Sequence, residues 1–411
     1  MKKYDLVVIG GGAAGMGAAI SAFDHGISDI LIIEKTNSLG GILNQCIHSG
    51  FGLTYFKEEL TGPEYASRFI KEVQNRGIQY ELEAMVLSLS KDKQLVYTSP
   101  KGTFEIEAKA IIASTGCYEK SRGKIKTDGS RPAGVFSAGA AQKYINQEGY
   151  MVGKKVFILG SGDIGLIMAR RMTLEGAQVL GVAELMPYSN GLNRNIVQCL
   201  EDYNIPLYLS TTVKEIVGKK RLEKVILAQV DEKFNFIQGT EKEIECDTLL
   251  LSVGLIPSNE LLEEIGCQMD PKTKGPIVNQ NLETSIPGIF ACGNNLHVHD
   301  LVDYVTKEAL LAGEKAAAYI NGTLDDQSDI DTIPGNMVNY LLPKRIKAND
   351  GVVTIKFRVK KPLKDVLLVI KNNDQVIREI KKQYLLPAEM ENINVDTSKL
   401  EKGNLVVEVK E

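Results

Sequence analysis

Two short glycine turns constrain the fold of this chain more than any other feature. They comprise residues 10–15 (GGGAAG) and residues 160–165 (GSGDIG). Each turn follows a short apolar run and opens a stretch of helix-forming residues. A second apolar run then ends in an acid, Glu34 or Glu184, which stands 24 residues after the first glycine in both cases. This context predicts two βαβ units of the dinucleotide-binding type, because a strand, a glycine turn, a helix and a second strand ending in an acid are its defining parts.

The residues of each turn have separate physical tasks. The first glycine permits the tight turn, the second lets the backbone approach a pyrophosphate, and the third lets helix and strand pack closely. The helix N-terminus then presents unpaired N–H groups to the phosphates, and the acid accepts hydrogen bonds from ribose hydroxyls. We therefore expect nucleotide contacts from Gly10, Gly12, Ala14, Gly15, Glu34 and Lys35 in the first unit, and from Gly160, Gly162, Asp163, Ile164, Gly165 and Glu184 in the second. The alternative is that the glycines serve packing alone.

Glu184 also bears on the choice of nicotinamide cofactor. A carboxylate at this position repels a 2′-phosphate, and residues 185–191 (LMPYSNG) contain no arginine to hold one. The sequence favours NAD(H) over NADP(H).

Composition excludes several classes of protein. With 48 basic and 52 acidic residues the net charge is −4, which argues against nucleic acid as a partner. The longest apolar runs, such as residues 247–257, fall far short of the roughly 20 residues that cross a bilayer, so no membrane span is expected. Six cysteines without a CxxC pair predict neither a disulfide scaffold nor a zinc ribbon. The apolar run from Leu6 to Ile9 is too short for a signal peptide core, so we expect a cytoplasmic protein.

Three further segments carry a family resemblance. Residues 114–116 (STG) and 252–257 (SVGLIP) resemble the two crossovers between the domains of two-dinucleotide flavoproteins, the pyridine nucleotide–disulfide oxidoreductase superfamily. Residues 288–294 (GIFACGN) resemble the GxFAxGD segment that holds the flavin ribityl chain, with Asn294 where the family usually has Asp. The resemblance covers about residues 1–325, and its spacing is close to the thioredoxin reductase layout.

This resemblance implies an FAD-dependent NAD(P)H oxidoreductase with an α/β fold. FAD would bind a discontinuous domain, 1–117 and 250–325, and the nicotinamide cofactor an inserted domain, 118–249; both are Rossmann-like. The resemblance adds Gly41, Val86, Thr115, Gly116, Gly254, Gly293 and Asn294 to the expected cofactor contacts.

The chain lacks the redox cysteine pairs of that family. Residues 134–155, just before the second glycine turn, contain no cysteine, whereas the thioredoxin reductase branch has CxxC there. The CxxxxC of the other branch is reduced to Cys46, with Gly41 five residues earlier. Dithiol–disulfide exchange of the usual kind is therefore not expected.

A narrower resemblance follows from the same departures. Residues 40–52, 134–142 and 292–305 are similar to small flavoprotein subunits associated with anaerobic glycerol-3-phosphate dehydrogenase, and to the FAD/NAD subunits of opine oxidase, hydrogen cyanide synthase and heteromeric sarcosine oxidase. The resemblance implies a second flavoprotein dehydrogenase subunit as partner. Two rival functions stay open: a free-standing NADH oxidase or peroxidase that uses Cys46, and a non-catalytic, FAD-holding assembly subunit. An oligomer is also compatible with the sequence.

Cys46 and His48 are the candidate catalytic residues. Cys46 follows the glycine pair where the family places a redox cysteine, so it is either a flavin-adjacent reactive thiol or a small packing residue. His48 is either a proton-transfer group or polar lining. His297, His299, Asp300 and Asp303 crowd one loop; we expect them to cap the following helix and line the flavin's edge, and expect no metal.

The last part of the chain has a different character. Residues 325–336 read as an acidic linker, and beyond it apolar and polar residues alternate, which predicts a small all-β module over 335–411. Residues 341–411 carry 15 basic and 10 acidic side chains. The module is either a solvated β-domain or a docking surface for an acidic partner.

Overall fold

The computed structural model describes residues 1–325 and 327–411 and divides into two compact units. The first unit comprises residues 1–117 and 257–411, and the second comprises residues 118–256. Within the described residues, no helix is both long and apolar enough to cross a membrane.

The main sheet of the first unit has the strand order β5-β2-β1-β8-β7-β6, with β20 beside β8. Its strands are β1 (Lys2–Ile9), β2 (Ile30–Ile33), β5 (Gln79–Glu81), β6 (Met85–Leu89), β7 (Gln94–Ser99), β8 (Gly102–Ala113) and β20 (Ile289–Ala291). The pairs among β5, β2, β1, β8 and β20 are parallel, whereas β6, β7 and β8 pair antiparallel. The four residues of β2 are all buried, as expected for a central parallel strand.

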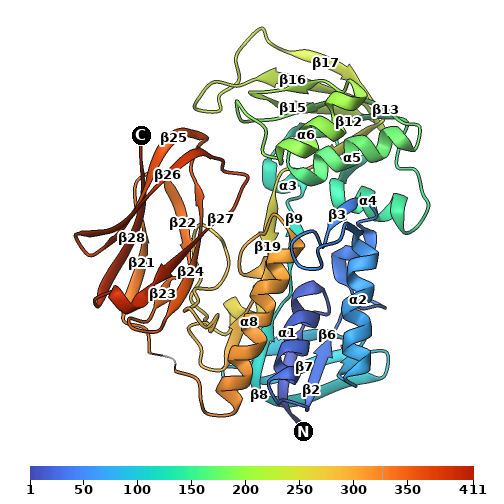
Figure 1. Cartoon of the computed structure of the whole chain (residues 1–411). Helices are drawn as coiled ribbons and strands as arrows, with labels where there is room; N and C mark the ends of the chain where they lie inside the picture. The colour runs from blue at the N-terminus through green and yellow to red at the C-terminus, as the bar shows by residue number, and fades with distance from the viewer. Residues whose placement is uncertain (326) are drawn as a thin grey trace. The chain divides into compact units, whose positions relative to one another are not determined.

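Small side chains let two helices approach closely over this sheet. Helix α1 (Ala13–Asp24) lies against α8 (Val302–Ile320), as Figure 1 shows. A Cβ atom at Gly313 of α8 would lie 2.1 Å from the carbonyl oxygen of Ala18 in α1, so only glycine permits this approach. The first unit also contains α2 (Gly62–Asn75), α7 (Glu260–Glu264), β3 (Ser49–Phe51) and β4 (Leu60–Thr61). The close contact with α8 holds α1 with its N-terminus at the carboxyl end of β1.

The C-terminal strands form two sheets, β23-β21-β28-β25-β26 and β22-β24-β27. The bounds are β21 (Ile330–Pro334), β22 (Val338–Leu342), β23 (Arg345–Ile346), β24 (Val352–Val359), β25 (Leu363–Asn372), β26 (Gln375–Leu385), β27 (Glu391–Asp396) and β28 (Gly403–Lys410). In β24, Ile355, Phe357 and Val359 are buried, so the expected alternation is confirmed. The linker prediction is wrong for residues 330–334, because β21 pairs with β28 there; residue 326 lies outside the described residues.

The second unit repeats the βαβ pattern in a five-stranded parallel sheet with the order β11-β18-β12-β13-β14. Its elements are β9 (Cys117–Glu119), α3 (Arg122–Ile125), β10 (Asp128–Gly129), β11 (Val135–Ser137), α4 (Ala138–Asn146), β12 (Lys155–Leu159), α5 (Asp163–Leu174), β13 (Gln178–Ala183), α6 (Asn193–Cys199), β14 (Leu207–Tyr208), β15 (Thr211–Gly218), β16 (Leu222–Gln229), β17 (Lys242–Glu245), β18 (Thr248–Leu251) and β19 (Leu255–Pro257). A four-stranded sheet, β10-β15-β16-β17, completes it. The predicted α/β class with two Rossmann-like units and C-terminal strands is confirmed.

Candidate functional site

The first glycine turn is shaped by close backbone approaches. Gly10 has a φ of +108°, and a Cβ there would lie 2.4 Å from the carbonyl oxygen of Ser114. A Cβ at Gly15 would lie only 1.8 Å from the carbonyl oxygen of Gly10. Gly12 differs, because nothing in the protein lies within 4 Å of a Cβ placed there. Two of the glycines are therefore required by the fold, whereas Gly12 borders open space.

The acid of the first unit, Glu34, is hydrogen-bonded to the backbone of this turn. The buried carboxylate of Glu34 accepts a hydrogen bond from the backbone N–H of Gly11 at 2.7 Å through Oε2. Its Oε1 accepts from the backbone N–H and the hydroxyl of Thr36, both at 2.8 Å. A carboxylate has about four acceptor positions, so this one keeps capacity for a further hydroxyl donor. Lys35 follows β2 and is exposed.

Two distant segments meet the N-terminus of α1. The backbone N–H of Gly40 donates to the carbonyl oxygen of Gly11 at 2.9 Å, and a Cβ at Gly41 would lie 3.2 Å from the Cα of Gly12. A Cβ at Gly293 would lie 2.8 Å from the Cβ of Ala14. The structure therefore brings together the predicted residues Gly12, Ala14, Gly41 and Gly293, although they come from three separate parts of the sequence.

Asn294 makes contacts that an aspartate in its place would make only in part. Its Oδ1 accepts a hydrogen bond from the backbone N–H of His299 at 3.1 Å, and its Nδ2 lies 3.7 Å from the sulfur of Cys117 as a donor. The amide thus donates and accepts at once, whereas an ionised carboxylate only accepts. The substitution keeps a polar side chain at the last position of the segment 288–294.

Three further predicted cofactor contacts, Thr115, Gly116 and Val86, also lie in the first unit. Thr115 donates its hydroxyl to the carbonyl oxygen of Ser258 at 2.5 Å, and Gly116 adopts a φ of +72° with open space beside it. Val86 lies in β6 with its side chain in a hydrophobic cluster that includes Ile9, and its backbone pairs with β7. The Val86 side chain is thus part of the core.

The first turn fits the diphosphate of a dinucleotide on structural grounds. Helix α1 has Gly12 as its N-cap, with no side-chain cap hydrogen bond, and a Cβ at Gly12 would meet no protein atom within 4 Å. Such a helix end offers hydrogen-bond donors and a partial positive charge to an anion. The residues present therefore suit FAD, which Gly12, Ala14 and Glu34 would hold.

The glycine turn of the second unit has a geometry similar to that of the first. Gly160 has a φ of +99°, and Cβ atoms at Gly160 and Gly165 would lie 2.1 Å from the Ser252 carbonyl oxygen and 2.5 Å from the Gly160 carbonyl oxygen, respectively. The buried Glu184 accepts from the backbone N–H of Ser161 at 2.9 Å and from its hydroxyl at 2.6 Å. Gly162 begins α5 without a side-chain cap, and the nearest atom to a Cβ there is 3.4 Å away. This turn fits a second dinucleotide.

Three other predicted cofactor contacts lie in the second unit, although the resemblance placed one of them, Gly254, in the FAD-binding domain. Asp163 accepts from the backbone N–H of Leu192 at 2.8 Å and from the side-chain amide of Asn195 at 2.7 Å, so its carboxylate holds the loop before α6. Ile164 is partly buried in the apolar core of the unit. Gly254 has a φ of +102° and lies beside Lys120, whose Nζ would be 3.3 Å from a Cβ there.

We expect Glu184→Gln to weaken NADH binding by about 10-fold, equivalent to about 1.4 kcal/mol, because a charged acceptor for the ribose hydroxyls becomes neutral. Binding of NADPH is expected to fall less, since the repulsion of its 2′-phosphate disappears with the charge. Dissociation constants for both nucleotides check this. Glutamine still offers an oxygen to Ser161, so the melting temperature serves as the control. A wild-type preference for NADPH would contradict the prediction.

Cys46 and His48 lie just after the short 3-10 helix Gly41–Gln45. The Cys46 thiol donates to the carbonyl oxygen of Ile42 at 3.3 Å, and burial raises the pKa of this thiol to about 12. The His48 ring lies 5.1 Å from that of Phe51, centroid to centroid. In this environment Cys46 is a protonated thiol at neutral pH, which does not favour nucleophilic use.

Alkylation of Cys46 in the flavin-free chain is expected to be slow and strongly pH-dependent. A pKa near 12 leaves on the order of 1000-fold less thiolate at pH 8 than an ordinary cysteine has, and the rate should rise tenfold per pH unit up to about pH 12. Iodoacetamide labelling with peptide mass mapping measures the rate, and Cys46→Ser identifies the peptide. A rate that levels off near pH 8 would contradict this expectation and support the oxidase or peroxidase alternative.

Residues 297–303, the last two of which lie in the first turn of α8, do not cap this helix as the sequence suggested. The helix begins after Leu301 without a side-chain cap. Asp303 instead accepts from the backbone N–H groups of Gly52 and Tyr55, at 3.2 and 2.7 Å. Asp300 pairs with Arg358 of β24. The carboxylates find these partners because other chain segments pack over the loop.

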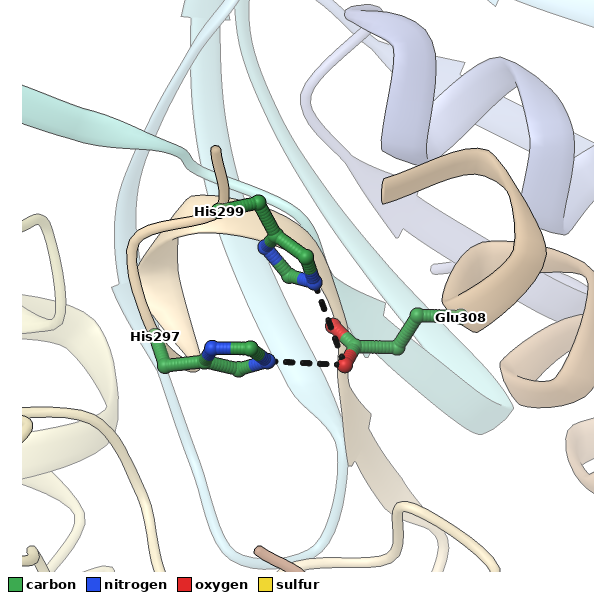
Figure 2. A group of neighbouring side chains, drawn as sticks. All are labelled: His297, His299 and Glu308. Atoms are coloured by element: carbon green, nitrogen blue, oxygen red, sulfur yellow. Dashed lines mark hydrogen bonds and ion pairs between the residues drawn. The ribbon is translucent and has the colours of Figure 1, made fainter. Parts of the chain in front are cut away.

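His297 and His299 point instead toward Glu308 on α8 (Figure 2). Nε2 of His297 lies 3.0 Å and Nε2 of His299 lies 3.4 Å from Oε2 of Glu308. Burial, with the neighbouring His299, lowers the pKa of His297 to about 3, so that ring is neutral. These three residues form a group, among the described residues, whose ligand atoms could hold a metal ion.

Sequence reasoning missed several residues that shape these sites. Ser114 and Ser252 close the two turns; both stand at the end of an apolar strand, and this repeated position was the available signal. No sequence pattern marked Glu308 or Lys356 as residues that shape these sites. One is an acid within a helix and the other a basic residue within an alternating strand.

Two turns with uncapped helix ends and buried acids, one on each unit, are typical of proteins that bind two dinucleotides. Comparison with known proteins identifies the class. The family model described as pyridine nucleotide-disulphide oxidoreductase matches residues 4–309. The chain belongs to this family, whose members bind FAD and NAD(P)H, and it is an FAD-dependent oxidoreductase.

Individual relatives are distant. Mitochondrial dihydrolipoyl dehydrogenase of Caenorhabditis elegans is 28% identical over 76% of this chain and 67% of its own length. One subunit of the opine oxidase of Agrobacterium tumefaciens is 24% identical over 71% of this chain and 61% of that protein. The crystal structure of T. acidophilum thioredoxin reductase superposes with a TM-score of 0.62 and 27% identity, covering 78% of this chain and 99% of that one. The predicted superfamily is confirmed.

Proposed function

We propose that this chain passes electrons between NAD(H) and a second redox protein, through FAD held at the first glycine turn. The observation that carries the proposal is the repeated glycine turn. In each unit the helix N-terminus lacks a side-chain cap, and its N-cap glycine has no protein atom closer than 3.4 Å to a Cβ placed there. A buried acid accepts a hydrogen bond from the backbone of each turn. When bound, FAD supplies a two-electron centre that exchanges a hydride with nicotinamide and passes electrons onward.

The lack of a cysteine pair supports a protein partner as the electron acceptor or donor. Cys46 has no second cysteine at the family's spacing, and its raised pKa disfavours a thiolate. A chain of this family without a redox disulfide must exchange the electrons of its flavin with another acceptor or donor. The opine oxidase relative is by its name one subunit of a larger oxidase. We propose as partner a flavoprotein dehydrogenase subunit of the glycerol-3-phosphate dehydrogenase type.

Anaerobic titration with NADH tests the first half of this proposal. We expect the purified chain to retain FAD, its flavin absorbance to bleach with one equivalent of NADH, and NADPH to be less effective. Affinity purification of the tagged chain from its native cells then tests the second half, with a flavin-containing dehydrogenase as the expected co-purifying protein.

Three outcomes would point elsewhere. A chain without flavin would overturn the proposal. Flavin that NADH does not reduce would support the non-catalytic assembly subunit. Rapid NADH consumption by the lone chain with oxygen or peroxide, lost in Cys46→Ser, would support the free-standing oxidase or peroxidase.

A further inference from the structure

The carboxylate of Glu308 is a buried charge that joins two parts of the first unit. Its side chain is 2% exposed. Oε1 accepts the backbone N–H of Gly293 at 2.8 Å, and Oε2 accepts from Nε2 of His297 at 3.0 Å. Gly293 begins the segment that meets Ala14 at the first glycine turn. The orientation of this carboxylate therefore bears directly on the position of a predicted FAD contact.

The counter-charge for Glu308 comes from the C-terminal strands. Nζ of Lys356 lies 2.5 Å from Oε2 of Glu308, although the two residues are 48 positions apart. Burial alone would raise the pKa of Glu308, but Lys356 and the two imidazoles hold this pKa well below its usual value. An ionised carboxylate in such surroundings depends on a partner of opposite charge.

A second cation of β24, Arg358, contacts the loop that follows Gly293. Lys356 and Arg358 share one face of β24, because side chains two residues apart in a strand point the same way. Arg358 pairs with Asp300 and donates to the carbonyl oxygen of Val298 at 3.2 Å. It also contacts Tyr340 at 3.2 Å. The face of β24 opposite the module's core therefore contacts this loop directly through Arg358, and reaches Gly293 indirectly through the pair of Lys356 with Glu308.

A metal ion is the competing explanation for His297, His299 and Glu308. Their ligand atoms lie within 4.8 Å of one another, and three ring nitrogens, Nδ1 of both histidines and Nε2 of His299, lack a hydrogen-bond partner among the described residues. However, the ammonium of Lys356 already shares Oε2 of Glu308. A dication there would face this ammonium in a poorly screened interior. We therefore favour Lys356 as the cation of the cluster.

We propose that Lys356 and Arg358 are positioning residues for FAD, through which the C-terminal β-module holds residues 293–300 in the conformation that binds the cofactor. The proposal rests on the FAD site proposed above. It makes the module part of the cofactor site, rather than only a solvated domain. Tyr340 and Leu342 of β22, which belong to the same hydrophobic cluster as α1 and α8, join the two parts further.

The test measures the dissociation constant of FAD for the full-length, deflavinated chain by quenching of flavin fluorescence. We expect Lys356→Met to raise this constant by at least about 10-fold, because Glu308 loses its counter-charge and releases Gly293. Lys356→Arg should restore binding to within about threefold of wild type. Lys360→Met, which changes an exposed lysine directly after the same strand, is the matched control and should bind FAD normally.

The double variant Glu308→Gln with Lys356→Met separates positioning from mere stability. Glutamine needs no counter-charge and still accepts the N–H of Gly293, so the double variant should bind FAD more tightly than Lys356→Met alone. Wild-type affinity in Lys356→Met, or no recovery in the folded double variant, would overturn the proposal. Stoichiometric zinc in the wild-type chain, lost in His299→Ala, would also overturn it by making the cluster a metal site. A wild-type chain that binds no FAD would instead refute the proposed function.

Discussion

Gly12→Ala is expected to leave a folded chain that no longer retains FAD. A Cβ at this position meets no protein atom within 4 Å, and the backbone (φ −76°, ψ −170°) is open to any residue. Replacing glycine at a helix N-cap by alanine costs on the order of 1 kcal/mol. The methyl group would, however, occupy the space that the diphosphate requires. We expect the dissociation constant of FAD to rise by at least about 100-fold, or about 2.7 kcal/mol.

Gly15→Ala provides the contrasting variant in the same turn. Its Cβ would lie 1.8 Å from the carbonyl oxygen of Gly10 and 2.8 Å from Oγ of Ser114, so helix and strand must move apart. Such overpacking costs about 1–3 kcal/mol or more. Thermal unfolding of the flavin-free chains should therefore separate the two variants: Gly12→Ala melts close to wild type, and Gly15→Ala melts clearly lower. Normal FAD binding by Gly12→Ala would refute the assignment of the first turn.

The second large effect is expected from Gly162→Ala, which should keep FAD but lose reduction by NADH. A Cβ at Gly162 would make only an ordinary contact, 3.4 Å from Oγ of Ser252, and the backbone (φ −64°, ψ 159°) accepts alanine. The second unit should therefore fold, but its open helix end would be obstructed. We expect NADH to bind at least about 100-fold more weakly.

Anaerobic stopped-flow measurement of flavin bleaching at increasing NADH concentrations checks this expectation. Gly12→Ala and Gly162→Ala serve as controls for each other, since one should lose flavin and the other should lose only the reaction with NADH. If Gly162→Ala reduced the flavin as wild type does, the second turn would not be the nicotinamide nucleotide site.

Much of the fold could be predicted from local pattern. The short apolar run before the second glycine turn is β12 (Lys155–Leu159), and the helix-forming stretch that this turn opens is α5 (Asp163–Leu174). These predictions succeed because a strand, a glycine turn and a helix in direct succession are defined by residues close in sequence.

The predictions that failed concern groups whose partners are distant in sequence. Asp300 and Asp303 were expected to cap α8, since a cap is the nearest local use for an acid before a helix. Their actual partners, Arg358 and the backbone of Gly52 and Tyr55, lie 58, 251 and 248 positions away. No local pattern indicates such a pairing.

The linker prediction failed for a related reason. Acidic and turn-forming residues in 325–336 suggested an extended connection, yet Ile330–Pro334 forms β21 by pairing with Gly403–Lys410. A strand is stabilised by its neighbour in the sheet, so its formation depends on a segment that can lie anywhere in the chain. Periodicity within five residues carries little information about that neighbour.

The sequence by itself determined the two nucleotide turns, the acid beneath each and the loss of the redox cysteine pair. Each of these features depends on residue types at fixed short spacings. Only the tertiary structure decided that Gly41 and Gly293 meet the same helix end, that Cys46 is a thiol of raised pKa, and that Lys356 reaches Glu308. These facts arise from burial and from charges brought together by folding, and such energies depend on distances in space rather than on separation along the chain.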